Sequence, residues 1–476
     1  MPPVKRDNTR AATLFTADEF LESPAAPSRA ALQLQDGARV GVIGGGPAGS
    51  FFSFFLLDMA QNMGLNLELD IFEPRDFSSP APRGCNMCGG IISETLVQYL
   101  ATEGINLPPT VVQRGIDAYT MHTDAGTTRI KTPLNEKRIA GVYRGAGPRD
   151  VKDSRWSSFD DYLLSMAAGK GARIRSTRVR EVRRLEDGRL HLSTRGQELP
   201  PYDLVGVAVG VNSAAGRIFK DFEFDYRPPQ TTKTAIREYN LGQGQVERYL
   251  GSAMHVFLLD IPRLEFAAII PKGNYATVCL LGQEIDNDLL SSFLQAPEVR
   301  ECFPPEWDWE QPACFCSPRI NVEGAKNPFA DRLVFLGDCG TTRLYKDGIG
   351  AAYRAAKSAA TTALYQGVAA SDFRRHYQPA CQAIAADNSI GKFIFVIVRQ
   401  IQRWRFARRA VLKMVAAEQR KAPESRRMST ILWDTFTGSA PYREVFMRAL
   451  HPVFLLRILW EATAAWLSGA IGRNGS

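Results

Sequence analysis

At 476 residues, the chain is long for one compact core and long enough for two closely built domains. Its content of 45% hydrophobic and 23% charged residues is ordinary for a soluble globular protein. A net charge of +8 suits nucleic acid, anionic lipid or an acidic partner, but no motif supports nucleic acid. Eight cysteines in this length do not form a disulfide scaffold, and without a signal peptide they favour a reducing, cytoplasmic location.

The first 37 residues precede any periodic pattern. Residues 1–37 contain scattered charges with Pro, Ala and Ser, and they lack the apolar core of a signal peptide. We interpret them as a disordered or extended leader.

The segment ARVGVIGGGPAGSFFSFFLLDMA, residues 38–60, is typical of a strand that turns into a helix at a dinucleotide site. Gly44 permits the tight turn, Gly46 lets the backbone approach a pyrophosphate, and Gly49 allows close packing of helix on strand. The free N–H groups at the helix start favour phosphate. The residues expected to contact the cofactor here are Gly44, Gly46, Pro47, Ala48 and Gly49.

A second buried strand follows at residues 67–74, and it ends in Glu73. An acid at this distance from the glycines binds a ribose hydroxyl. Glu73 therefore favours an unphosphorylated adenosine ribose, as in FAD or NAD, although Arg75 leaves slight room for NADP. We expect both residues to contribute to the cofactor site.

The stretch RGCNMCGG, residues 83–90, places Cys85 and Cys88 three residues apart. A metal site would need at least two further ligands, and Cys314 and Cys316 form the only other cysteine cluster in the sequence. A dithiol coupled to the cofactor and a role in lining a pocket are the other interpretations. We predict no metal site and leave the other two open.

Residues 331–364 repeat the strand–turn–helix pattern. Asp338 follows a buried strand and can accept hydrogen bonds from a polyol, and residues 348–350 open an alanine-rich helix. A helix N-terminus stabilises negative charge on a reduced ring. Two such turns nearly 300 residues apart fit one long dinucleotide held at both ends, which favours FAD. The second set of expected cofactor contacts is Asp338, Gly348, Ile349 and Gly350.

Three elements, residues 38–73, 155–174 and 331–364, carry a resemblance to a known family. On them the chain resembles the geranylgeranyl reductase family, within the para-hydroxybenzoate hydroxylase-type FAD-dependent oxidoreductase superfamily. The resemblance implies a mixed α/β (α+β) fold, in which a Rossmann-like FAD-binding domain is interleaved with an antiparallel-sheet substrate domain and followed by a helical C-terminal region. The implied divisions are a leader at 1–37, an FAD-binding domain at 38–213 (with insertions) and 331–385, a substrate domain at 214–330, and C-terminal helices at 386–476.

The resemblance also implies roles for single residues. Asp338 would meet the ribityl chain of FAD, and Arg155 would lie beside the cofactor. Cys88, Gly89 and Gly90 match a Cys-Gly element near the flavin of this family. Tyr345 stands where the family has a proline before the late glycines. The expected catalytic set is therefore Cys88, Gly89, Gly90 and Tyr345.

Three departures bear on the reaction. Residues 209–212 lack the Gly-Ala-Asp-Gly of the superfamily's hydroxylases, which puts direct reduction by NADPH in doubt. Ala268 replaces a tryptophan on a substrate-side strand, so the pocket there is wider or differently shaped. WDWEQP, residues 307–312, is only superficially similar to a flavin halogenase motif, and we interpret it as coincidence.

The C-terminal region has the pattern of a membrane-surface protein. Residues 391–421 predict a basic amphipathic helix, which favours lipid or a protein partner over a solvated helix. Residues 451–472 are apolar, but Arg457 and Glu461 interrupt them on one helical face. No run reaches the roughly 18 uninterrupted apolar residues of a spanning helix. We expect a protein peripheral to the inner face of the membrane.

The sequence thus predicts an FAD-dependent oxidoreductase that reduces or dehydrogenates C–C bonds of an isoprenoid or other lipid-like substrate at a membrane surface. Its electrons would come from NAD(P)H or from a reductase or ferredoxin-type protein. One alternative is a flavin-dependent monooxygenase that hydroxylates or epoxidises, or less often halogenates. Another is a non-catalytic flavoprotein electron-transfer partner.

Overall fold

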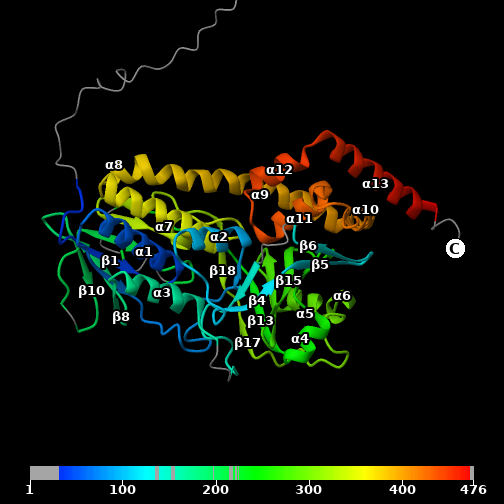
Figure 1. The fold of residues 1–476 in the computed structure, drawn as a ribbon, viewed down its shortest axis with the longest axis horizontal. Coiled ribbons are helices and arrows are strands. Elements are labelled where there is room, and N and C mark those ends of the chain that lie inside the picture. The colour runs from blue at the N-terminus through cyan, green and yellow to red at the C-terminus, as the bar shows by residue number, and fades with distance from the viewer. Residues whose placement is uncertain are drawn as a thin grey trace, which may run out of the picture.

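The structure is a computed structural model, and it describes residues 32–133, 139–151, 156–196, 198–213, 218–219, 222 and 224–471. Most of the expected leader lies outside the described residues, and so does Arg155. Figure 1 shows the described elements as one elongated body, with the N-terminal half at one end and the last helices at the other.

A six-stranded sheet forms the core of the N-terminal half. Five strands are parallel and only the first, an edge strand, is antiparallel. Parallel strands need both faces covered, and four of the five have runs of buried residues. In sheet order the strands are β19 (Phe329–Ala330), β20 (Leu333–Phe335), β11 (Leu204–Val207), β1 (Arg39–Ile43), β2 (Glu68–Phe72) and β8 (Arg173–Arg175).

Two long helices lie side by side in this half, as Figure 1 shows: α1 (Pro47–Asn62) and α7 (Gly348–Tyr365). The ring of Tyr353 meets the rings of Phe51 and Phe55 edge-on, with centroids 5.7 and 5.4 Å apart. Alanines on α7 let the two helices approach closely, since seven of them are buried. Helices α2 (Glu94–Thr102) and α3 (Phe159–Gly169) complete the packing around α1.

A second, seven-stranded sheet forms the other half. Its strands β14 and β5 pair in parallel and all other neighbours are antiparallel. Strands β5 and β6 belong to the chain before residue 213, so the insertion expected in 38–213 supplies part of this sheet. In order the strands are β17 (Cys314–Cys316), β13 (Ala235–Asn240), β16 (Tyr275–Gly282), β15 (Leu264–Lys272), β14 (Ala253–Phe257), β5 (Ala118–Thr123) and β6 (Gly126–Lys131).

The two faces of this sheet have different neighbours. One face packs against α4 (Gln243–Tyr249), α5 (Asn287–Gln295) and α6 (Pro297–Arg300). The opposite face, with Phe266, Ala268 and Ile270, packs against the C-terminal helices α10 (Arg405–Glu418) and α11 (Arg427–Thr437). Along β15 the side chains alternate between these two clusters, as the pleat requires.

Smaller elements join the halves. A three-stranded sheet contains β3 (Ile91–Ile92), β7 (Ile139–Val142) and β4 (Val112–Ile116). Two strand pairs are β9 (Glu181–Arg184) with β10 (Leu190–Ser193), and β12 (Gln230–Lys233) with β18 (Arg319–Glu323). The last helices are α8 (Ala370–Asp372), α9 (Gln378–Arg403), α12 (Tyr442–Ala449) and α13 (Pro452–Ile471).

The predicted fold class is confirmed, and one predicted element is corrected. Residues 391–421 do not form one helix: the chain leaves helical geometry at Trp404, between α9 and α10. The turn places Arg408, which is buried, against Asp124 at 2.6 Å. Because this partner lies 284 residues away, no local pattern reveals the break.

One helix among the described residues, Ala370–Arg403, is long and apolar enough to cross a membrane by length and composition. It runs along the upper edge of the molecule in Figure 1, from α7 toward the last helices. Core helices of soluble proteins meet the same criteria, so a single such helix does not establish a membrane span.

Candidate active site

The glycine turn after β1 has the geometry of a dinucleotide loop. Gly44 has φ +106°, and a Cβ there would lie 2.5 Å from the carbonyl oxygen of Ala208. A Cβ on Gly49 would lie 1.9 Å from the carbonyl oxygen of Gly44. Both glycines are therefore required by the protein's own backbone. Gly46 differs, because a Cβ there would meet only the side-chain amide of Asn86, at 3.4 Å. The turn is open where a ligand backbone would approach it.

Glu73 lies beside this turn, as expected. Its carboxylate accepts a hydrogen bond from the backbone N–H of Gly45 at 3.0 Å and pairs with the Arg75 guanidinium at 3.3 Å. The carboxylate is buried at the end of β2, where it can accept hydrogen bonds from ribose hydroxyls. Arg75 also donates to the side chain of Asn86. The predicted adenosine-end residues thus lie together.

The segment RGCNMCGG passes over the glycine turn. Its Asn86 side chain lies at Gly46 and donates to Asp160, which is fully buried in the first turn of α3. Asp160 in turn forms two hydrogen bonds with the guanidinium of Arg144. An ordered chain of polar groups therefore runs from Glu73 to Arg144 along the turn.

Arg144 is a site residue that sequence reasoning missed. It follows β7 and its side chain is 10% exposed. Burial lowers the pKa of its guanidinium, but Asp160 and the Cys88 thiol outweigh burial and raise it overall. The only local signal for Arg144 in the sequence is its position as a charged residue two positions after the buried strand β7. This fixed cation lies close enough to Asp338 to act on that carboxyl as well, so it suits a phosphate or an anionic ring.

The second turn meets the first. A Cβ on Gly337, which has φ +62°, would lie 2.7 Å from the Cβ of Ala48 at the start of α1. Burial raises the pKa of the adjacent Asp338 carboxyl, and Arg144 opposes the rise. The two turns that were predicted from segments nearly 300 residues apart are thus in contact. They form one continuous cradle at the carboxyl ends of β1 and β20.

The start of α7 is held by Asp347, whose backbone has φ +54°. A Cβ on Gly350 would lie 2.1 Å from the Asp347 carboxylate, so glycine is required there. Gly348 is exposed, and the side chain of Ile349 is buried. The backbone N–H of Gly350 is hydrogen-bonded to the Asp347 carboxylate, and the first turn of α7 is open to a ligand at Gly348.

Cys88, Gly89 and Gly90 lie between the turns and the seven-stranded sheet. A Cβ on Gly89 would lie 3.5 Å from Ile270 and 3.7 Å from the sulfur of Cys279. A Cβ on Gly90 would lie 2.0 Å from the carbonyl oxygen of Val142. The loop therefore contacts the face of the sheet that bears Phe266 and Ala268. Tyr345, with φ +57°, packs edge-on against Phe395 of α9 at 4.9 Å.

Two cysteine pairs that are far apart in the sequence line one narrow cavity of about 30 Å³. The pairs are Cys85 with Cys88, and Cys314 with Cys316. Burial raises the pKa of the Cys85 thiol to about 11 and that of Cys316 above its usual range. The four sulfur atoms do not lie close enough together to bind one metal ion. The arrangement therefore favours the pocket-lining interpretation.

Cys85 is expected to react slowly with iodoacetamide at neutral pH. Burial raises its pKa from 9.0 to about 11, so its thiolate fraction is roughly 100-fold smaller than that of an ordinary cysteine. The alkylation rate, followed by mass spectrometry of the peptide that contains Cys85, should rise about tenfold per pH unit up to about pH 11. Free glutathione serves as the reference thiol. Rapid alkylation at neutral pH would instead identify an activated dithiol.

Two buried lysines border the cradle. The ammonium nitrogen of Lys346 lies 2.8 Å from the centroid of the Phe266 ring, and burial lowers its pKa well below its usual range. Lys272 is 1% exposed and pairs with Glu238 at 3.7 Å. Neither lysine stands out in sequence. Lys346 is placed to exchange a proton beside the second turn.

The C-terminal region closes the site. The guanidinium of Arg343 donates to the backbone oxygens of Gly438 and Ala440 and stacks on the Tyr442 ring at 4.4 Å. A Cβ on Gly438 would lie 2.9 Å from the Cβ of Asp347. The loop after α11 therefore packs directly on the turn that opens α7.

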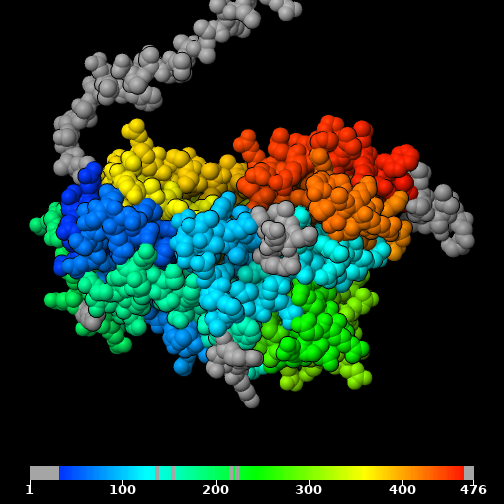
Figure 2. Space-filling view, viewed as in Figure 1, coloured from blue at the N-terminus to red at the C-terminus, as the bar shows by residue number. Residues whose placement is uncertain are grey.

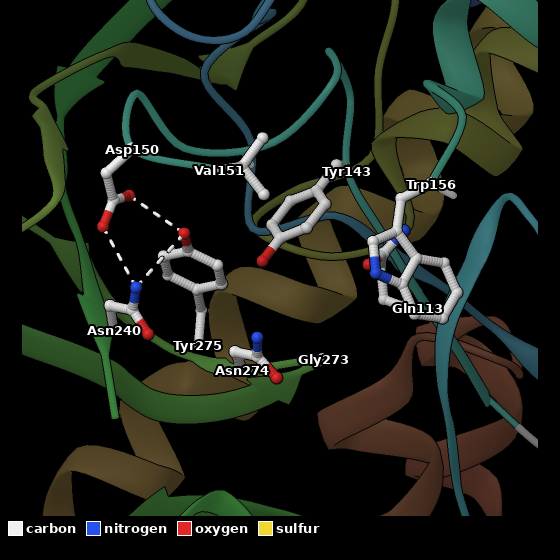
Figure 3. A pocket seen from close by; sticks show the side chains of 9 residues that line it. All are labelled: Gln113, Tyr143, Asp150, Val151, Trp156, Asn240, Gly273, Asn274 and Tyr275. Carbon is white, nitrogen blue, oxygen red and sulfur yellow. Dashed lines mark hydrogen bonds between the residues drawn. The ribbon is translucent and has the colours of Figure 1, made fainter. Parts of the chain in front are cut away.

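A larger cavity of about 420 Å³ adjoins the narrow one, and Tyr143 lines both. Figure 3 shows Asp150 accepting hydrogen bonds from Tyr275 and Asn240, at 3.0 and 3.1 Å, across the cavity from Gln113. The amide of Gln113 is buried without a hydrogen-bond partner in the described part of the chain. The cavity is thus polar and offers unused hydrogen-bonding groups.

The departures noted in the sequence have structural counterparts. Asn212, which follows β11, forms two hydrogen bonds with the backbone of Arg319, at 3.0 and 2.8 Å, so its side chain has a structural role there. Trp307 and Trp309 pack around Tyr239 on the sheet face away from the cradle. That placement separates WDWEQP from the candidate site. Ala268 lies on the cradle side, among Phe266 and Ile270.

The fold is that of the FAD-dependent oxidoreductases and monooxygenases. A geranylgeranyl bacteriochlorophyll reductase-like protein from Thermoplasma acidophilum matches at a TM-score of 0.51 and 15% identity, over 90% of this chain and 96% of that one. The halogenase PltM, in a structure with phloroglucinol and FAD, matches at 0.55 and 12%, over 91% and 92%. The p-nitrophenol 4-monooxygenase PnpA from Pseudomonas putida matches at 0.53 and 11%, over 84% and 98%.

No protein family and no curated protein matches the chain. The structural matches agree with the predicted FAD cofactor and oxidoreductase class. They do not separate the geranylgeranyl reductase family from the monooxygenases, which match over similar lengths.

Proposed function

We propose that the chain is an FAD-dependent oxidoreductase that acts on a lipid-like substrate at a membrane surface. The observation that carries the proposal is the continuous cradle formed by two glycine turns, with Gly337 packed on Ala48 beside an apolar sheet face. The residues of the cradle fit FAD. Glu73 suits the adenosine ribose, the Gly46 turn and Arg144 suit the pyrophosphate, and Asp338 suits the ribityl chain.

Bound FAD would supply hydride or electron transfer. The protein's own contribution is to hold and shield the reacting region. The N–H groups at the start of α7 and the buried Arg144 stabilise negative charge there. Lys346 holds or releases a proton beside Phe266, and the loop after α11 excludes water from the second turn.

The apolar character of the sheet face supports a hydrocarbon-like substrate. Where the loop of residues 88–90 meets the sheet, the neighbouring side chains are Ile270 and Cys279, and Phe266 and Ala268 continue the same face. All four are buried. C–C reduction or dehydrogenation of an isoprenoid would use the part of this face beside residues 88–90, because the rest packs against α10 and α11. A polar substrate group would use the cavity lined by Gln113 and Asp150.

The first test is whether the purified protein contains bound flavin. We expect bound FAD in its absorption spectrum, and anaerobically reduced flavin that is reoxidised by an unsaturated isoprenoid. Absence of flavin, together with no binding of added FAD, would contradict the proposal.

A monooxygenase is the second candidate, because PltM and PnpA share the fold over most of the chain. Substrate-stimulated consumption of both NADPH and O₂ would select it. Residues 209–212 contain no aspartate where hydroxylases of the resembled superfamily have Gly-Ala-Asp-Gly, and this absence argues against it.

The membrane part of the proposal rests on α13. Its charged face points inward, where Arg457 pairs with the buried Glu418 at 3.6 Å and Glu461 with Lys413 at 2.8 Å. Phe454 and Ile458 pack against the core, but four other apolar residues point outward: Val453, Leu456, Leu459 and Trp460 are 67, 68, 62 and 72% exposed. A helix that pairs its charges inward and exposes its apolar side suits a lipid surface better than water. Figure 1 shows α13 running past α10 at the edge of the molecule, and Figure 2 shows its coloured part on the surface there.

Replacing Leu456 or Trp460 with glutamate is expected to lower partitioning into phosphatidylcholine vesicles roughly 10- to 100-fold, because each loses about 1.5–3 kcal/mol of apolar burial. Co-sedimentation with vesicles measures the effect. Leu185→Glu is the matched control, since Leu185 is exposed in the N-terminal half.

Salt should change vesicle binding little. Several basic residues of the 391–421 segment are already paired with the protein's own acids, including Arg399 with Glu265 and Arg405 with Asp124.

Equal binding of the glutamate variants and the native protein would contradict the membrane proposal and leave the flavin proposal unaffected.

A further inference from the structure

Two histidines and a cysteine converge on the sheet face opposite the cradle. His122 on β5 and His255 on β14 lie on neighbouring parallel strands, and Cys302 follows α6. The Nε2 atom of His122 lies 2.8 Å from Nδ1 of His255. The sulfur of Cys302 lies 3.3 Å from Nδ1 of His255 and 3.7 Å from Nε2 of His122. All three residues are buried.

The outward sides of both rings are already engaged. Nε2 of His255 lies 3.2 Å from the carbonyl oxygen of Leu250, so it carries the proton and leaves a lone pair on Nδ1. Nδ1 of His122 lies 3.3 Å from the hydroxyl of Thr127, which can accept a hydrogen bond from this nitrogen when it carries the proton. Metal-binding histidines are oriented in this way, by a hydrogen bond from the ring nitrogen that does not bind the metal.

The three inward atoms have the spacing of ligands around one ion. Zinc–nitrogen bonds of 2.0–2.1 Å and zinc–sulfur bonds of 2.3 Å in tetrahedral geometry place ligand atoms about 3.3–3.6 Å apart. The two sulfur–nitrogen distances bracket this range, and the rings need to part by only about 0.5 Å.

The proton balance is simple. A divalent ion displaces the thiol proton of Cys302 into solvent, and the inward proton of His122 moves to Nδ1, facing Thr127.

We propose that His122, His255 and Cys302 form a zinc-binding site that fastens the turn after α6 to the seven-stranded sheet. A histidine₂–cysteine set suits a borderline-soft ion such as Zn²⁺, and the described residues place no fourth His, Cys or carboxylate in the group. A water molecule would have to complete the tetrahedral shell. The site lies on the face covered by α4–α6 and is structural, so it is independent of the flavin proposal.

The test uses the full-length protein after removal of metal by a chelator. We expect one Zn²⁺ per chain by equilibrium dialysis and metal analysis, and a rise in melting temperature on adding Zn²⁺. Co²⁺ in place of Zn²⁺ should give a thiolate-to-metal charge-transfer band, and X-ray absorption should show one sulfur and two histidine nitrogens. These measurements need no substitution, so they remain informative if a variant fails to fold.

Cys302→Ser and His255→Gln should each remove the bound ion and the charge-transfer band while leaving flavin absorbance unchanged. Cys381→Ser and His191→Gln are the matched controls, because neither residue lies in the group, and both should bind one Zn²⁺. The proposal is overturned if the native protein binds no Zn²⁺ or Co²⁺, if stoichiometry survives both cluster substitutions, or if the site takes Cu⁺ and rejects Zn²⁺.

Discussion

Replacing Gly46 with valine is expected to leave the protein folded and to weaken FAD binding roughly 5- to 150-fold. A Cβ at Gly46 meets only the movable side chain of Asn86, so the fold has room for it. The added side chain would project into the turn that receives the pyrophosphate. The expected loss corresponds to about 1–3 kcal/mol of overpacking. Titration of apoprotein with FAD, followed by flavin fluorescence, measures it.

The comparison variant is Gly49→Val. Its Cβ would lie 1.9 Å from the carbonyl oxygen of Gly44, so the backbone of the turn itself has to move. We expect this variant to be destabilised or insoluble whether or not FAD is present. If Gly46→Val bound FAD as tightly as the native protein, the cradle would not be the pyrophosphate site.

Replacing Asp160 with asparagine is expected to lower the free energy of unfolding by about 3–5 kcal/mol, because it leaves the Arg144 guanidinium buried without a counter-charge. Asp160 is fully buried, and the side chain of Arg144 is 10% exposed. Denaturant titration measures the loss. Asp161→Asn is the matched control: it removes the neighbouring first-turn carboxylate, which forms no ion pair with the described residues, and should change stability by about 1 kcal/mol or less.

The double variant Asp160→Asn, Arg144→Met separates two causes. If the loss in the single variant comes from the unpaired cation, the double variant should recover much of the stability, since no charge is left buried. It should nevertheless bind FAD weakly, because Arg144 is gone. If the double variant is as unstable as the single variant, Asp160 acts mainly by packing at the start of α3.

Local patterns in the sequence were sufficient to predict both turns of the cradle. Gly49 is needed because of the carbonyl oxygen of Gly44 five residues earlier, Gly44 has the positive φ of a tight turn, and Glu73 follows the next strand of the parallel sheet. The need for a particular residue type in such a turn can be recognised from a short stretch of sequence. The fold class follows from them, because a strand, a glycine turn and a helix define how a parallel sheet begins.

Long-range pairs could not be predicted in this way. Arg144 acquires its role only when Asp160 and Asn86 are brought to it. The helix break at Trp404 depends on Asp124, and the apolar–basic pattern continues through it without a Pro or Gly. His122, His255 and Cys302 come from three segments with no shared spacing. Their meeting depends on strand register and on where α6 ends.

The contact between Arg343 and the backbone of Gly438 and Ala440 has a consequence for synthesis of the protein. The glycine turn near residue 44 is made first, but the turn at residues 343–350 reaches its final packing only after residue 440 has been added. We therefore expect the whole cofactor to be bound only late in synthesis of the chain. A ribosome-bound chain that stops before residue 438 would retain the adenosine end of the site and lack the cover over its redox end.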